Sequence, residues 1–81
     1  MTAETQIVRE LDLRGYICPI PLVKIHQAIK EIEIGDVISG VATDPGVVTE
    51  IPAWCENSGN EVLKLERTDA QSFVFQVRRN R

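Results

Sequence analysis

The residue with the clearest chemical potential is Cys18, in the run Tyr-Ile-Cys-Pro-Ile-Pro at positions 16–21. This run lies where a strand pattern gives way to a helix pattern. A cysteine at the start of a helix ionises easily, and the thiolate is the form that attacks, binds metal or carries sulfur. Proline is favoured at the first helical position and keeps the entry rigid. The run therefore predicts a reactive sulfur at a rigid helix entry.

We expect Cys18 at the N-cap, followed by the first three helical residues Pro19, Ile20 and Pro21. The two prolines have no amide hydrogen, so only the Ile20 amide can point at the sulfur. That amide and the helix dipole both favour the thiolate. The alternative is that Cys18 is a small apolar residue that fills the corner between strand and helix, because free cysteines are among the most buried residues.

Other kinds of cysteine chemistry find little support in the sequence. A cysteine hydrolase needs a histidine base, and His26 lies roughly 12 Å along the helix axis from Cys18. We expect His26 to be a surface residue. Cys18, His26 and Cys55 do not show the spacing of a zinc site, and no second sulfur lies near Cys18 for dithiol exchange. Cys55 is a candidate resolving thiol, but its position after Val48 and Ile51 on one helix face favours a core role.

The pattern of apolar residues predicts six elements. Strands are expected over residues 7–13, 37–42, 61–68 and 72–78, and helices over 19–32 and 44–58. Asp44 is the expected N-cap of the second helix with Pro45 as its first residue, and Pro52 should kink or restart that helix. The residues expected to face the core include Leu22, Ile25, Ile29, Ile32, Leu63, Leu65, Phe73, Phe75 and Val77.

The order βαβαββ predicts an α/β (α+β) two-layer sandwich. A strand–helix–strand unit favours parallel pairing with a right-handed crossover, and the loop at 69–71 joins the last two strands as an antiparallel hairpin. One mixed four-stranded sheet with both helices on one face is the simplest result. The other face of the sheet is then open to water or to a partner.

Size and charge limit the functional classes. The 81 residues form one small domain, 1–81, and the formal net charge of −3 argues against direct nucleic-acid binding. No apolar run is long enough to cross a membrane, and the N-terminus lacks the blocks of a signal peptide. We therefore expect a cytoplasmic protein, and a monomer.

Four segments together resemble the TusA-like (SirA-like) sulfur-carrier family. They are Leu-Asp-Leu-Arg-Gly at 11–15, Cys-Pro-Ile-Pro at 18–21, Asp-Pro-Gly at 44–46 and Ile-Pro-Ala-Trp-Cys at 51–55. They follow one another with family-like spacing over nearly the whole chain. The resemblance implies a two-layer βαβαββ sandwich like the C-terminal domain of bacterial translation initiation factor three, in agreement with the fold predicted from the residue patterns.

The resemblance also implies a function for Cys18, which would accept sulfur as a persulfide and pass it on, as a carrier rather than a turnover enzyme. The implied donors are cysteine desulfurases or rhodanese-type sulfurtransferases. The implied acceptors are relay proteins of tRNA thiolation, molybdenum-cofactor metabolism or sulfur oxidation. No cofactor and no metal are implied. The motif residues expected to support Cys18 are Arg14, Gly15, Pro19, Ile20 and Pro21.

One residue departs from the family pattern. Several members carry a basic residue directly before the motif cysteine, where this chain has Ile17. Charge support for a persulfide anion must then come from Arg14, from the helix amides or from the partner. Two other functions stay open: a binding or regulatory module in which Cys18 is only a helix cap, and a redox-sensing thiol with Cys55 as its partner.

Overall fold

The computed structural model describes residues 7–69 and 71–81. The strands are β1 (Ile7–Leu13), β2 (Val37–Ala42), β3 (Glu61–Asp69) and β4 (Ser72–Arg78), and the helices are α1 (Ile20–Lys30) and α2 (Val47–Ser58). This is the predicted βαβαββ order. The predicted hairpin loop at 69–71 includes residue 70, which lies outside the described residues.

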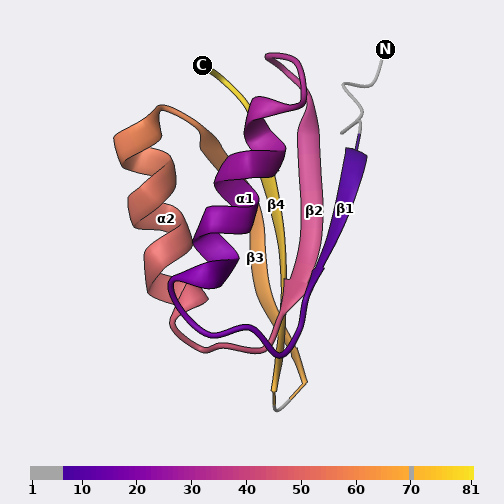
Figure 1. Ribbon diagram of the computed structural model, residues 1–81, viewed down its shortest axis with the longest axis vertical. Coiled ribbons are helices and arrows are strands. Elements are labelled where there is room, and N and C mark those ends of the chain that lie inside the picture. The colour runs from indigo at the N-terminus through magenta and orange to yellow at the C-terminus, as the bar shows by residue number, and fades with distance from the viewer. Residues whose placement is uncertain (1–6, 70) are drawn as a thin grey trace.

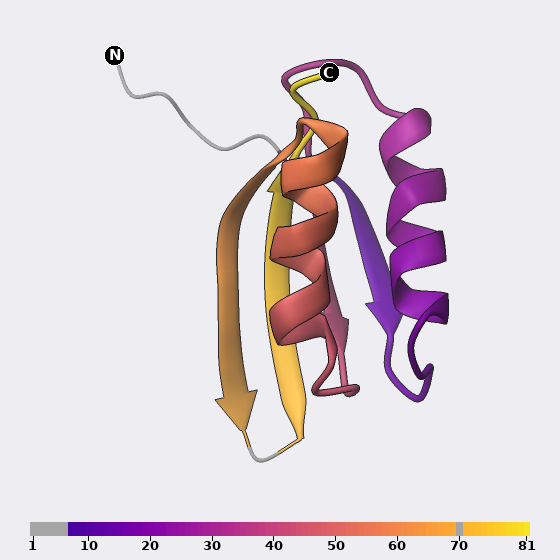
Figure 2. The same ribbon diagram turned by 90° about the vertical axis from the view of Figure 1, so that its left-hand side faces the viewer.

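The four strands form one mixed sheet in the order β1-β2-β4-β3. β1 and β2 are parallel, whereas β4 runs antiparallel to both β2 and β3. Both helices cover the same face of this sheet, and the opposite face carries no helix (Figures 1 and 2). The predicted two-layer sandwich is therefore confirmed. No helix within residues 7–69 and 71–81 has the length and apolar character needed to cross a membrane.

The core lies between the sheet and the two helices. Ile25 and Ile29 of α1, Ile51 of α2 and Phe75 of β4 are all buried in it. Side chains alternate between the two faces of a strand, and Phe73, Phe75 and Val77 face the helices as predicted. Phe75 lies opposite Gly40 of β2, and a Cβ atom at Gly40 would collide with the Phe75 ring.

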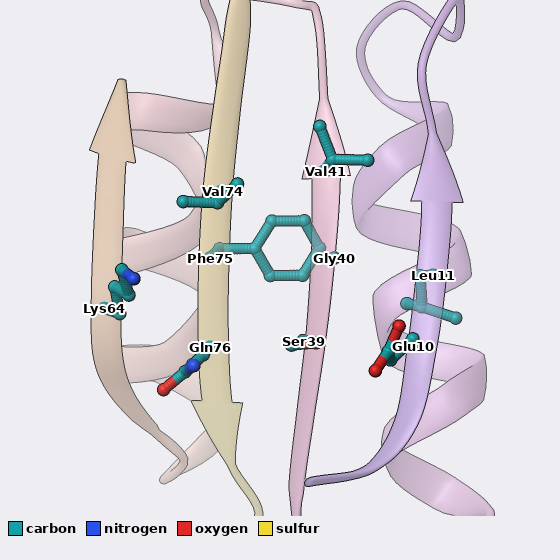
Figure 3. Close-up of a pocket in the computed structure, with 9 residues that line it drawn as sticks. All are labelled: Glu10, Leu11, Ser39, Gly40, Val41, Lys64, Val74, Phe75 and Gln76. Atoms are coloured by element: carbon teal, nitrogen blue, oxygen red, sulfur yellow. The ribbon is translucent and has the colours of Figure 1, made fainter. Parts of the chain in front are cut away.

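The open face of the sheet carries the alternate side chains of the strands. It has a depression to which β2 contributes Ser39, Gly40 and Val41 (Figure 3). Glu10 lies on the β1 side of this depression and Lys64 on the β3 side. This hollow is on the opposite face from the helices and contains no cysteine.

Three details of the helices differ from the predictions. The first helix is shorter than predicted, because it begins at Ile20 and ends at Lys30. In α2, Val47 is buried and Val48 is exposed, so the apolar face begins one residue earlier than predicted. The helix also continues through Pro52, so the predicted restart does not occur, since a proline removes only one hydrogen bond of the ladder; the alternative, a kink at Pro52, stays a prediction.

The predicted face of β3 is also partly wrong. Leu65 packs against the core, but Leu63 does not belong to it. The pairing of β3 with β4 shifts register between Val62 and Lys64. A bulge of this kind adds a residue and breaks the alternation of the side chains, so Val62 replaces Leu63 on the side of the helices.

Candidate functional site

The candidate site is built from two loops that leave neighbouring parallel strands. The loop from β1 to α1 and the loop from β2 to α2 lie at the same end of the sheet (Figure 1). Their contact is made by two hydrogen bonds. The Gly15 amide donates to Thr43 Oγ1 at 2.9 Å, and the Cys18 amide donates to Asp44 Oδ2 at 2.9 Å. Gly15 has φ of 87°, a conformation that glycine adopts without strain.

Cys18 is exposed and lies just before the first helix. The N-cap is Pro19 rather than Cys18, because the Pro19 carbonyl accepts the hydrogen bond from the Val23 amide. The Ile20 amide donates to the Ile17 carbonyl at 2.9 Å and is not available to the sulfur. The prediction that Cys18 caps the helix and that the Ile20 amide supports its sulfur is therefore wrong. The peptide bond between Cys18 and Pro19 is cis.

The sulfur has a different partner, because Cys18 Sγ donates a hydrogen bond to Oε1 of Glu50 in the first turn of α2. This bond, together with desolvation and the charges of Glu50 and Asp44, raises the pKa of Cys18 to about 11. A carboxylate next to a thiol stabilises the neutral form. The prediction that the local environment favours the thiolate is thus wrong for the isolated protein, in which Cys18 is a thiol at neutral pH.

Arg14, the expected source of charge support, is paired within its own loop. Its guanidinium makes two hydrogen bonds of 2.8 Å to the Asp12 carboxylate. The Arg14 side-chain hydrogen bonds lower the pKa of Asp12 to about 2 and raise the pKa of Arg14. The structure therefore gives the Arg14 charge a carboxylate partner rather than directing it at the sulfur.

Glu50 and Asp44 are the two site residues that the sequence analysis did not assign. Asp44 was expected to cap the second helix, but Gly46 is the N-cap of α2 and the Asp44 carboxylate accepts from Cys18 instead. The topology could have indicated this, because loops that follow adjacent parallel strands meet at one edge of the sheet. The role of Glu50 had no comparable signal in the sequence.

The other motif residues form the frame of the site. Pro21 is buried at the second position of α1, whereas Ile20 is 42% exposed. Ile17, directly before Cys18, is 69% exposed, and Val48 in the first turn of α2 is 46% exposed. The exposed sulfur is thus flanked along the chain by uncovered apolar side chains. Exposed apolar side chains mark a surface that contacts other proteins when they form a contiguous patch.

Neither Cys55 nor His26 takes part in the contacts described for Cys18. Cys55 is 2% exposed within the core, and burial raises its pKa to about 11, so the predicted core position of Cys55 is confirmed. The His26 ring packs edge-to-face on Trp54 with 5.9 Å between the ring centroids. Within residues 7–69 and 71–81, no three histidine, cysteine or acidic residues are grouped as a metal site would require.

The known proteins that this chain resembles are sulfur carriers and their relatives. The family model of Sulfurtransferase TusA matches residues 9–79. A putative sulfur carrier protein of Aquifex aeolicus is 37% identical over 83% of this chain, which spans only 34% of that relative. The sulfur carrier protein TusA of Pseudomonas putida is 33% identical over 85% of both chains.

A solved structure supports the fold. The crystal structure of a SirA-like protein from Desulfitobacterium hafniense is similar with a TM-score of 0.79 and covers 91% of this chain and 100% of its own. Its sequence identity is 19%, so this likeness concerns the fold alone.

Proposed function

This chain belongs to the TusA family of sulfur carriers, and we propose that Cys18 is the residue that accepts sulfur as a persulfide and relays it to another protein. The observation that carries the assignment to Cys18 is the contrast between the two cysteines. Cys18 is exposed on a loop, whereas Cys55 is buried in the core. Only an exposed sulfur can meet the reactive sulfur of another protein.

The proposed transfer is two thiol-exchange steps without net oxidation. The Cys18 thiolate attacks the outer sulfur of a donor persulfide, a new S–S bond forms on Cys18, and the donor cysteine leaves as a thiolate. In the second step an acceptor thiolate attacks the outer sulfur on Cys18, and Cys18 leaves as a thiolate. Each step breaks one S–S bond and forms another, so no cofactor is needed.

The donor and acceptor are proteins, and their classes are part of the proposal. A cysteine desulfurase or a rhodanese-type sulfurtransferase supplies the sulfur, and a relay protein of tRNA thiolation, molybdenum-cofactor metabolism or sulfur oxidation takes it. The carrier acts in the cytoplasm as a monomer, with residues 1–81 as one domain. Gly15, Pro19, Ile20 and Pro21 hold the loop that presents Cys18, and Arg14 with Asp12 fixes its start.

The test is to incubate the protein with a cysteine desulfurase and cysteine, and separately with a rhodanese and thiosulfate, and to measure the intact mass. We expect the mass of one sulfur atom to be added to the wild type and to the Cys55→Ser control, but not to Cys18→Ser. Sulfur that still loads onto Cys18→Ser would move the site elsewhere. A wild type that gains no sulfur from either donor would refute the carrier role of Cys18.

A further inference from the structure

Two carboxylates of the β2–α2 region contact Cys18 at different atoms. Asp44 accepts from its backbone amide, and Glu50 accepts from its sulfur. The first contact holds the loop in place, because it joins two segments 26 positions apart in the sequence. The second contact acts on the reacting atom itself, and it requires the proton to stay on the sulfur.

The positive charges around the site have other partners. Arg14 pairs with Asp12, and Lys24 of α1 lies over the Tyr16 ring at 5.1 Å. Within residues 7–69 and 71–81, no ion pair to Glu50 is formed. The Glu50 carboxylate that accepts from the exposed sulfur therefore has no cationic partner among these ion pairs, and the second carboxylate at Cys18, from Asp44, adds no positive charge.

The hydrogen bond from Cys18 to Glu50 opposes sulfur exchange unless a partner protein disrupts it. The attacking species in sulfur exchange is the thiolate, whereas the Glu50 contact favours the thiol. A cation that pairs with Glu50 weakens the hydrogen bond from the Cys18 thiol, because a carboxylate engaged by an ammonium or guanidinium is a weaker acceptor. It also reduces the repulsion between the Glu50 carboxylate and a Cys18 thiolate.

We propose that Glu50 is a positioning residue that keeps Cys18 a neutral thiol in the free carrier, and that a lysine or arginine beside the reactive sulfur of the donor protein pairs with Glu50 and releases Cys18 to react. This inference rests on the sulfur-carrier function proposed for Cys18. It also identifies a chemical feature of the donor, a cationic side chain at the point of contact. The exposed Ile17 and Val48 would contact the apolar surroundings of that cation.

The proton and the sulfur can be followed through the step. When the cation pairs with Glu50, the Cys18 proton passes to water. The thiolate then forms a bond to the outer sulfur of the donor persulfide as the bond within that persulfide breaks. The donor cysteine leaves as a thiolate, and the step is redox-neutral. An uncharged carrier thiol thus becomes a nucleophile only at a matching partner, which limits its reaction with other electrophiles.

The first test measures the alkylation of Cys18 by iodoacetamide in the free protein as a function of pH. Glu50→Gln removes the charge, and Glu50→Ala removes the acceptor as well. If the pKa of Cys18 falls from about 11 to its ordinary value of 9.0, the thiolate fraction at pH 8 rises about 100-fold while its nucleophilicity falls about tenfold, for a net gain of about tenfold.

The matched control for this test is Glu56→Gln, which removes an exposed carboxylate in the last part of the same helix. We expect it to alkylate at the wild-type rate, and circular dichroism will verify that all variants are folded. Equal rates for the wild type, Glu50→Gln and Glu50→Ala, with all three folded, would overturn the inference that Glu50 holds the thiol neutral.

The second test asks whether a cation is recognised, using two small disulfides as probes. Cystamine carries an ammonium group at each end, and hydroxyethyl disulfide is its neutral counterpart. Both probes meet the same thiolate fraction within one variant, so the ratio of their exchange rates isolates charge recognition. We expect this ratio to be about fivefold higher in the wild type and Glu56→Gln than in Glu50→Gln.

The two tests are separable from the test of the carrier function. An unchanged ratio in Glu50→Gln would refute the cationic partner even if Cys18 loads with sulfur. Failure of sulfur loading would refute the carrier role even if Glu50 controls the thiol. If Glu50→Gln alkylates faster and loses its preference for cystamine, both parts of the inference are supported.

Discussion

The pair of Asp12 and Arg14 controls the charge at the beginning of the Cys18 loop. Arg14 holds the pKa of Asp12 at about 2, below its ordinary value of 3.8. Because the pKa is depressed in the folded protein, the contribution of this pair to stability is present above pH 3.8 and is lost as the pH falls toward 2. The pair is exposed to solvent, so its contribution is subject to screening by salt.

The first prediction concerns this pair. In Arg14→Gln the Asp12 carboxylate loses its cationic partner, and we expect its pKa to rise from about 2 toward 3.8. The titration of the Asp12 side chain by NMR measures the shift. The ion pair of Arg78 with Glu61 provides a control, because Arg78→Gln should leave the Asp12 titration unchanged. An unchanged Asp12 titration in Arg14→Gln would contradict the assigned cause.

The second prediction concerns the close approach at Gly40. A Cβ atom there would meet the buried Phe75 ring and would lie 2.9 Å from the Leu11 carbonyl oxygen. Neither can move freely in a packed core, so we expect Gly40→Ala to lower the free energy of unfolding by about 1–3 kcal/mol. Urea unfolding measures the change. The neighbouring Ser39→Ala, which faces the other side of the sheet, should change it by less than about 0.5 kcal/mol.

The sequence was sufficient to identify Cys18 but not to determine its protonation state. The strand-to-helix change and the two prolines locate a presented cysteine, and these signals are local. The acidity of the sulfur depends on Glu50, which is 32 positions away, and on the exact residue at which the helix begins. A shift of the N-cap by one residue, to Pro19, takes the Ile20 amide away from the sulfur.

At the scale of the elements, the order and type of all six were predictable because each has its own pattern. Helical spacing in α1, β-branched residues in β2 and alternation in β4 are local properties. The boundaries and the faces were less accurate, because they depend on contacts between elements. The bulge near Leu63 in β3 and the exposure of Val48 in α2 arise from packing that periodicity alone does not contain.

The third prediction belongs to helix α2. Pro52 lies inside this helix and cannot donate to the Val48 carbonyl, so Pro52→Ala restores one hydrogen bond and relieves the clash of the ring. The more flexible unfolded chain offsets part of this gain. We expect the free energy of unfolding to rise by about 1–2 kcal/mol, as measured by urea unfolding.

The control for this change is Pro45→Ala, in the turn before the helix. There the same substitution restores no hydrogen bond of the helix and only loosens the unfolded chain, so we expect a loss of about 0.4–1 kcal/mol. A loss of stability in Pro52→Ala of the same size would show that the contacts of the Pro52 ring outweigh the missing hydrogen bond.

At the scale of the whole molecule, the two-layer architecture gives the two cysteine side chains different environments. Packing both helices on one face of the sheet creates a single core, and Cys55 lies inside it. The same arrangement brings the β1–α1 and β2–α2 loops together outside that core, and Cys18 of the first loop contacts Asp44 of the second. The topology thus places one of the two cysteines of the chain on the surface and the other in the core.

The fourth prediction follows from that protection. Cys55 is 2% exposed. In the Cys18→Ser variant it is the only remaining cysteine, and we expect it to react with a thiol reagent only when the core opens. For a domain of ordinary stability, we expect its labelling to be slower than in the unfolded chain by at least about a thousandfold. Labelling with dithionitrobenzoate at increasing urea concentrations measures the reaction rate of Cys55, which is compared with the unfolding curve from circular dichroism.

The two possible outcomes have different consequences for Cys55. If its labelling rate rises in parallel with global unfolding, Cys55 is a core residue and cannot resolve an oxidised Cys18. A rate close to that of the unfolded chain in the absence of urea would instead require a local opening of α2, and Cys55 would then be accessible to Cys18 chemistry.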